Sequence, residues 1–223
     1  MWKGRVADRQ TLSSKATNLY ASRFPHQASQ PRRRTPRLLI SHILSPIVLG
    51  TLLLALSPLR DARISWAGAI VAALFTTVIP WLLLVTAKLR GRVTDLHVTV
   101  RRQRHGIYAM TSGLILCGLL VLWLMDAGAG IFREVLCMLL GLLVVAIINI
   151  WWKVSVHLAV GTYAILQVAG QSPQLTPWVL LFIAVLSWSR IRSFQHTATQ
   201  VCGGVAVGIA IHYAHEAMAL VLY

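Results

Sequence analysis

The stretch of this sequence best suited to chemistry is residues 189–200, which holds an arginine, a histidine and a glutamine between two apolar runs. Arg190 carries a planar guanidinium whose geometry matches the oxygens of a phosphate group. His196 and Gln200 are four residues apart, so in a helix Gln200 would lie one turn away and could orient the ring by a hydrogen bond. These residues together predict a phosphoryl-transfer site. Arginines that anchor the end of a membrane span are an alternative reading of this stretch taken alone.

A second candidate stretch, residues 153–157, reads Lys-Val-Ser-Val-His and begins an apolar run. A serine in this place is ordinarily a helix N-cap, and Ser155 can be interpreted in that way. The start of a helix also directs free N–H groups and the positive end of the helix dipole toward an anion. His157 would then lie in the first turn, beside any anion held there.

A third stretch, residues 88–106, has six basic residues and two histidines in a connection longer than a turn requires. A loop that fixes membrane topology would account for the lysine and most of the arginines. It would not account for Asp95, His97 and His105, which are interleaved among them.

The composition is that of a membrane protein, since 57% of the 223 residues are hydrophobic and only 12% are charged. The formal charge of +15 would suggest nucleic acid in a soluble protein. Here most basic residues flank apolar runs, which indicates membrane orientation, and we expect no nucleic-acid partner. The three cysteines lie within apolar runs and share no metal-ligand spacing, so we expect no metal site.

The chain divides by composition into two parts. Residues 1–37 contain nine basic residues against one acid, and Ser, Gln and Pro fill much of the rest. We interpret this segment as a basic, disordered cytoplasmic tail that can lie on anionic lipid. Residues 38–223 form the expected membrane domain.

Seven apolar runs predict an all-α, polytopic bundle that crosses the membrane seven times, or six times if the first run is peripheral. They cover 38–58, 66–87, 107–125, 135–152, 157–170, 177–188 and 201–223. The fifth and sixth runs are too short to cross as they stand, so we expect them to extend into their flanks or to tilt in a thinned region.

An up-and-down path through seven spans places the three candidate stretches and the tail on one face. That face then has 18 lysines and arginines, and the opposite face has three, Arg60, Arg63 and Arg133. The asymmetry predicts that the N-terminus and the candidate site face the cytoplasm.

One further polar cluster lies in the last run, where His212, His215 and Glu216 share a helical face. Such a face could suit a metal or a proton path. We expect a structural role instead, with pairing to Arg133 or to water, because the cluster lies toward the opposite face.

The three stretches, taken in order, resemble the type-2 phosphatidic acid phosphatase superfamily, whose members share a fold with vanadium haloperoxidases. The family pattern ends in Ser-Arg-x5-His-x3-Asp. This motif is matched at Ser189, Arg190 and His196, with Gln200 in place of the aspartate.

The two preceding motifs of the family, Lys-x6-Arg-Pro and Pro-Ser-Gly-His, are matched less completely. Ser155 and His157 match the second, with valines at the usual Pro and Gly positions. Arg104 matches the first, with His97 in the lysine position and His105 in the proline position.

The resemblance implies an acid-phosphatase-like helical core and a metal-free phosphohydrolase that uses no cofactor. His196 would be the nucleophile that forms a phosphohistidine, and His157 would protonate the leaving oxygen and later activate water. The phosphate would be held by Arg104, Arg190, Ser155, His97 and a backbone N–H near Val156.

The expected function is therefore an integral membrane phosphatase acting on a lipid phosphate or a prenyl (di)phosphate at the cytoplasmic headgroup level. The alternative is a non-enzymatic membrane scaffold that keeps the fold and binds lipid phosphate. The amide of Gln200 orients the His196 ring but lacks the charge of the family's aspartate, which is compatible with slow turnover or with the scaffold.

Overall fold

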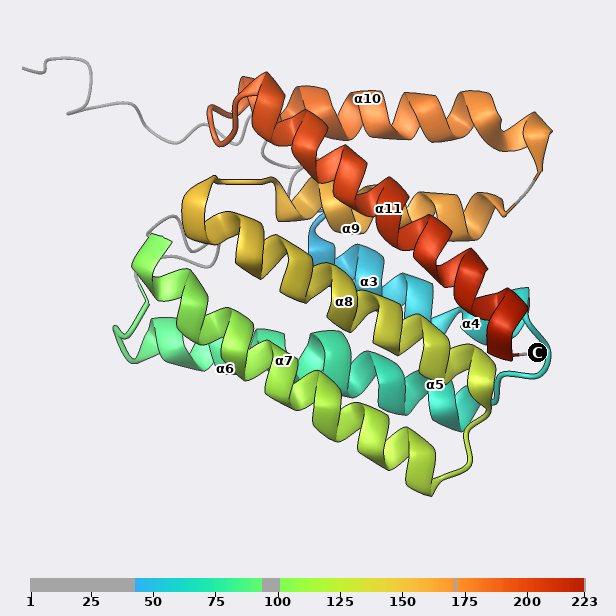
Figure 1. Ribbon diagram of the computed structural model, residues 1–223. Helices are drawn as coiled ribbons and strands as arrows, with labels where there is room; N and C mark the ends of the chain where they lie inside the picture. Colours follow the sequence, from blue (N-terminus) through green and yellow to red (C-terminus); the bar gives the residue numbers. More distant parts are fainter. Residues whose placement is uncertain (1–42, 94–100, 171, 223) are drawn as a thin grey trace, which may run out of the picture. The chain divides into compact units, whose positions relative to one another are not determined.

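The computed structural model describes residues 43–93, 101–170 and 172–222. The chain separates into two units, Met1–Pro36 and Arg37–Tyr223. The predicted basic tail, residues 1–37, lies outside the described residues. Throughout the described ranges every regular element is helical, as the apolar runs predicted (Figure 1).

Short connections join the helices that follow one another within each described range, and successive long helices run in opposite directions (Figure 1). In chain order they are α3 (Pro46–Ala55), α4 (Ser57–Arg60), α5 (Trp66–Ala73), a π-helical turn η1 (Leu74–Val78), α6 (Ile79–Leu89), α7 (Arg101–Leu124), α8 (Ala129–Trp151), α9 (Val156–Ala169), a 3-10 turn η2 (Pro173–Leu175), α10 (Thr176–Arg192) and α11 (Ala198–Leu222).

This alternation gives the bundle two ends. We call one the motif end, because it holds the α8–α9 connection (152–155) and the α10–α11 connection (193–197), with the last turn of α6 and the first turn of α7 (Figure 1). The far end holds the connection 125–128, the turn η2 and the C-terminus of α11. All the described parts of the three candidate stretches therefore lie at the motif end, as the up-and-down path predicted.

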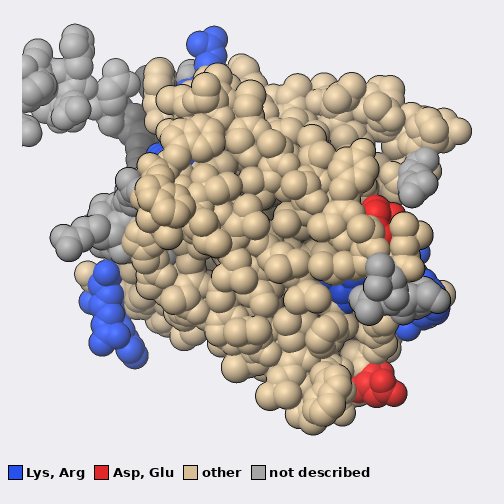
Figure 2. Space-filling view, viewed as in Figure 1, with Lys and Arg blue, Asp and Glu red and all other residues tan. Residues whose placement is uncertain are grey.

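Within the described residues, four helical segments are long and apolar enough to cross a membrane. They are Trp66–Leu89, His105–Leu124, Ala129–Trp151 and Pro173–Arg192. The last of these extends the run 177–188 to 20 residues, which agrees with the expected extension into its flanks. In Figure 2 a broad band without charged side chains separates the charged groups at the two ends, as a membrane protein requires.

The other three predicted spans are not among these four, so a count of six or seven crossings remains a prediction. The described helix in the first run, α3, has ten residues, and α9 has 14, each shorter than the roughly 20 residues that a crossing needs. Helix α11 has 25 residues, which is long enough, but it carries His212, His215 and Glu216.

Helix α9 is the centre of the bundle, because α3, α10 and α11 all pack against it. Two glycines of α11 allow the closest of these approaches. A Cβ at Gly204 would lie 2.5 Å from the Ser155 carbonyl oxygen, and one at Gly208 would lie 2.6 Å from that of Ala159. This G-x-x-x-G spacing brings the two backbones into contact, as small residues do between membrane helices. It fixes the start of α11 beside the start of α9.

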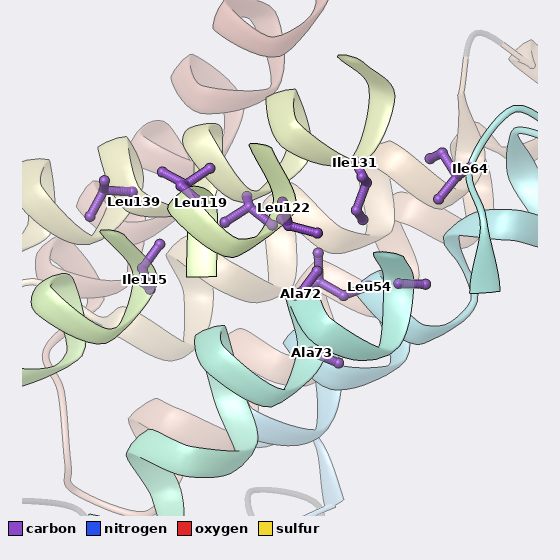
Figure 3. Close-up of a cluster of buried hydrophobic side chains, with 11 residues drawn as sticks. Leu54, Ile64, Ala72, Ala73, Ile115, Leu119, Leu122, Ile131 and Leu139 are labelled. Carbon is purple, nitrogen blue, oxygen red and sulfur yellow. The ribbon is translucent and has the colours of Figure 1, made fainter. Parts of the chain in front are cut away.

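The largest apolar cluster packs α5, α7 and α8 together with Leu54 of α3 (Figure 3). In Figure 3 Leu122 of α7 lies near Ala72 of α5, whereas Ile115 lies further along α7, on the side of Leu139 of α8, and all four side chains are buried. The serines Ser45 and Ser65 begin α3 and α5 as N-caps, each accepting a hydrogen bond from a backbone N–H three residues on. The sequence therefore specifies both the helix starts and the faces that meet.

Candidate active site

A cavity of about 820 Å³ lies in the bundle, and the motif end supplies its polar wall. His157 of α9, Arg190 of α10 and His196 of the α10–α11 connection all line it. Two of the predicted motifs, separated by more than 30 residues of sequence, thus contribute to one site. Arg190 is buried, whereas the two histidines are partly exposed.

The His196 ring is held by Gln200, as the four-residue spacing predicted. Its Nδ1 lies 3.2 Å from Gln200 Oε1. The backbone N–H of Thr197 donates to the same atom at 3.2 Å, which identifies that atom as the amide oxygen. An oxygen only accepts, so His196 Nδ1 must carry the hydrogen, and the lone pair of the neutral ring is on Nε2.

Gln200 takes this position because it is part of a capping box. The Thr197 Oγ1 accepts a hydrogen bond from the Gln200 N–H at 3.4 Å, while the Gln200 side chain returns to the Thr197 N–H. These reciprocal bonds satisfy two of the free N–H groups at the start of α11. The same amide oxygen therefore begins the helix and orients the histidine.

The end of α10 turns the chain back toward His196. The N–H of Phe194 bonds the Ile191 carbonyl and the N–H of Gln195 bonds the Arg190 carbonyl, which together form a Schellman motif. The motif requires a left-handed residue, and Phe194 takes that conformation with φ 54°, where glycine is usual. Such a conformation costs a non-glycine residue about 1–3 kcal/mol. Its ring is 94% exposed and lines the cavity.

Ser155 lies at the N-cap of α9, but its side chain makes no capping bond. Its Oγ is fully buried and has no hydrogen-bond partner in the described part of the chain. The serine backbone N–H donates to the Gln200 carbonyl at 3.1 Å, so the starts of α9 and α11 are joined directly. Ser155 itself is not among the described residues that line the cavity, whereas Val156 and His157, which follow it, are.

The first motif is only partly within the described residues. His97 lies outside them. Arg104 is in the first turn of α7, and its side chain lies outside the description. Ile107 and Tyr108, one helical turn further along, line the cavity, so α7 does run beside the site.

The structure adds Lys153 and Gln195 to the polar wall of the cavity. Sequence reasoning counted Lys153 only as a topology-determining charge. Lys153 Nζ donates to the Gln195 carbonyl oxygen at 2.7 Å, which ties the α8–α9 connection to the residue before His196. A signal was present in the sequence, because Lys153 belongs to the same candidate stretch, residues 153–157, as Ser155 and His157.

The rest of the cavity wall is largely apolar. It includes residues of α3, α6, α7, α8 and α11, for example Pro46, Leu84, Ile115, Met138 and Ile211. A cavity of this size and character, with polar groups at one end, suits an amphiphile with a charged head and a hydrocarbon chain.

The polar cluster of α11 lies apart from this site. Arg133 Nε donates to His215 Nε2 at 3.2 Å, which confirms the expected pairing with Arg133. His215 Nδ1 lies 3.4 Å from Glu216 Oε1. In the described ranges no three His, Cys, Asp or Glu side chains are grouped as a metal site requires.

No family model matches this sequence, and comparisons with the curated proteins and with the solved structures find no match. The family resemblance therefore depends on the motif residues and on where they lie.

Proposed function

We propose that this protein is an integral membrane phosphatase that hydrolyses a lipid phosphate or a prenyl (di)phosphate through a phosphohistidine intermediate. The observation that carries the proposal is the lining of one cavity by His157, Arg190 and His196, with the His196 ring held by Gln200 at 3.2 Å. In this proposal His157 is the acid–base group, Arg190 is the phosphate-binding cation and His196 is the nucleophile. They follow one another along the chain in the same order as in the family pattern.

The hydrogen on His196 Nδ1 leaves Nε2 as the attacking atom. In the first step a bond forms between Nε2 and phosphorus, and the bond from phosphorus to the leaving oxygen breaks. His157 gives its proton to that oxygen, which leaves as an alcohol or as the shorter phosphate. In the second step water attacks the phosphohistidine, His157 takes a proton from the water, and inorganic phosphate is released with His196 restored.

Positive charge and N–H groups stabilise the transferring phosphoryl group. Arg190 presents a guanidinium to its oxygens, and Arg104 is assigned the same role by the resemblance, with His97 as a further donor. The backbone N–H of Val156, at the first position of α9, has no acceptor within its own helix, and Val156 lines the cavity.

The apolar part of the cavity is the proposed position of the substrate chain. Acyl chains and prenyl chains both fit its chemistry, so the two substrate classes remain alternatives. The proposed site faces the cytoplasm, on the basis of the 18 to three distribution of basic residues.

The second candidate function is a membrane scaffold that binds lipid phosphate without turnover. Two observations favour it: Gln200 replaces the family's carboxylate, and the buried Ser155 is not among the described lining residues. Both observations concern supporting residues, whereas the nucleophile and the acid–base group are retained, and for that reason we prefer the phosphatase.

The test is release of inorganic phosphate by purified protein from a panel of phosphatidate, prenyl phosphate and prenyl diphosphate, with EDTA present. We expect release that is unaffected by EDTA and absent in His196→Ala. Tight binding of these lipids with no release by the wild-type protein would establish the scaffold and exclude the phosphatase.

A further inference from the structure

The described wall of the cavity has two fixed positive charges, Lys153 and Arg190, and no carboxylate. A phosphate ester carries one or two negative charges near neutral pH, and it gains further charge on its oxygens as the phosphoryl group transfers. In the family pattern a lysine of the first motif contributes to this binding, and this chain has His97 at that position. A neutral histidine at that position would donate one hydrogen bond and supply no charge, whereas a lysine keeps its charge at neutral pH.

Lys153 is placed to supply this charge. The residue lies in the short connection between α8 and α9, four residues before His157, and it is partly exposed. Its Nζ is held 2.7 Å from the carbonyl oxygen of Gln195, which is the residue before His196. The ammonium therefore joins the connection that leads into His157 to the connection that carries His196.

The bond to Gln195 orients the ammonium and leaves its charge in place, because a carbonyl oxygen is neutral. An ammonium has three N–H donors, so it can hold a carbonyl oxygen and a phosphate oxygen together. Both the lysine and its Gln195 partner line the cavity. A lysine that only determined the membrane topology would need neither the bond to Gln195 nor a place in the cavity wall.

We propose that Lys153 is a phosphate-binding residue of this site, providing a cation in place of the lysine that the first motif of this chain lacks. This proposal rests on the phosphatase function proposed above, or on its lipid-phosphate-binding alternative, since both require an anion in the cavity. It adds a residue that the family pattern does not contain.

The experiment compares Lys153→Met, Lys153→Arg and the wild type in detergent micelles. Methionine keeps much of the length of the side chain without its charge, and arginine keeps the charge. Lys88→Met is the matched control, because Lys88 is an exposed lysine in the last turn of α6, at the same end of the bundle, and is not among the described lining residues. Three quantities are measured: kcat/KM for phosphatidate, the Kd for phosphatidate from intrinsic tryptophan fluorescence, and Tm.

Lys153→Met should weaken phosphatidate binding and lower kcat/KM by roughly 10- to 100-fold, the range for one hydrogen bond to a charged group. Lys153→Arg should recover most of this loss, and Lys88→Met should match the wild type in all three measurements. Equal losses in Lys153→Met and Lys153→Arg, with a lowered Tm, would show that the lysine only joins the two connections, and would overturn the proposal. Unchanged binding in Lys153→Met would overturn it as well.

The two proposals fail in different ways. A wild-type protein that releases no phosphate overturns the phosphatase, and the Kd measurements then decide the role of Lys153 on their own. A wild-type protein that releases phosphate, with Lys153→Met equally active, overturns only the role of Lys153.

Discussion

Glu134 of α8 holds Arg60 of α4 through both carboxylate oxygens, each 2.8 Å from the same guanidinium nitrogen. The guanidinium also donates to the carbonyls of Leu53 and Gln167, near the C-termini of α3 and α9. These are the two helices that are too short to cross a membrane. Arg60 therefore satisfies backbone carbonyls at the ends of both short helices, and Glu134 neutralises its charge.

Removal of Glu134 should be strongly destabilising. The Glu134 side chain is 4% exposed and that of Arg60 is 25% exposed, so Glu134→Ala leaves a partly exposed cation without its carboxylate. We expect a loss of about 1.5–3 kcal/mol in the free energy of unfolding, the range for hydrogen bonds to a charged group. Thermal unfolding in detergent measures it.

The control is Arg63→Met, which breaks an ion pair with Asp61 at the same end of the bundle. The Arg63 side chain is 69% exposed, and exposed ion pairs contribute about 0–1 kcal/mol. Equal effects of the two substitutions would show that the Arg60–Glu134 pair does not stabilise the short helices.

The contact between α9 and α11 should depend on Gly204. A Cβ there would lie 2.5 Å from the Ser155 carbonyl oxygen, so Gly204→Ala must move the start of α11 away from α9. Because His196 and Gln200 lie at that start, we expect lower phosphate release together with a loss of about 1–3 kcal/mol in stability.

Gly113→Ala is the matched control for this substitution. Gly113 lies in α7, and a Cβ there meets nothing within 4 Å. The control should be as stable as the wild type or more stable by about 0.5–1 kcal/mol, because alanine favours a helix. Full activity and stability in Gly204→Ala would contradict the close helix contact.

The sequence predicted the class of fold and the approximate course of most helices, because apolar runs and charged boundaries are local signals. Four residues of separation also predicted the bond between His196 and Gln200, since a helix brings such residues together. The run 157–170 matches α9 within one residue, and α9 does not extend further into its flanks, whereas α3 covers only ten residues of the run 38–58. The contact of Arg60 with the Gln167 carbonyl joins residues 107 positions apart, and no local pattern reports a tertiary contact of that kind.

In the candidate site, too, local sequence signals were readable and tertiary contacts were not. Residues 189–200 allowed two interpretations when taken alone, and the family resemblance, in which their motif is nearly complete, assigned them to one site with His157. Lys153 was overlooked because its partner, Gln195, is 42 residues away. The burial of Ser155 follows from Gly204, on another helix, and only the packing of α9 against α11 reveals it.

The distribution of basic residues predicts opposite locations for the two termini. Eighteen lysines and arginines fall on the N-terminal side of a seven-span path and three on the other. The C-terminus of α11 lies at the far end (Figure 1). A reporter fused to the N-terminus should be cytoplasmic, and one fused to the C-terminus should be on the opposite side. Two reporters on the same side would require an even number of crossings.

Loss of His157 should affect the proton transfer more than binding. His157→Ala should lower turnover of lipid phosphate by roughly 10²- to 10⁴-fold, the range for a general acid–base group, with lipid binding largely kept. An aryl phosphate whose leaving group needs no proton should show a smaller loss in a single-turnover measurement. If both substrates lost activity equally, His157 would not be the proton donor.

The last prediction tests His196, the proposed nucleophile, separately from Gln200, which holds its ring. His196→Ala should show no turnover above background and should trap no phosphoenzyme, because the covalent route is gone. Gln200→Ala should be slower but active, since the ring loses its partner and α11 loses part of its capping box.

Gln200→Glu keeps the reach of the side chain and its bond to the Thr197 N–H, and it adds a negative charge beside His196 Nδ1. That charge stabilises the protonated ring in the family's manner, so turnover should be maintained or raised. Single-turnover phosphate release measures all three variants against the wild type. Retained activity in His196→Ala would exclude the phosphohistidine mechanism, and lower activity in Gln200→Glu than in Gln200→Ala would show that Gln200 does not act through the charge state of the ring.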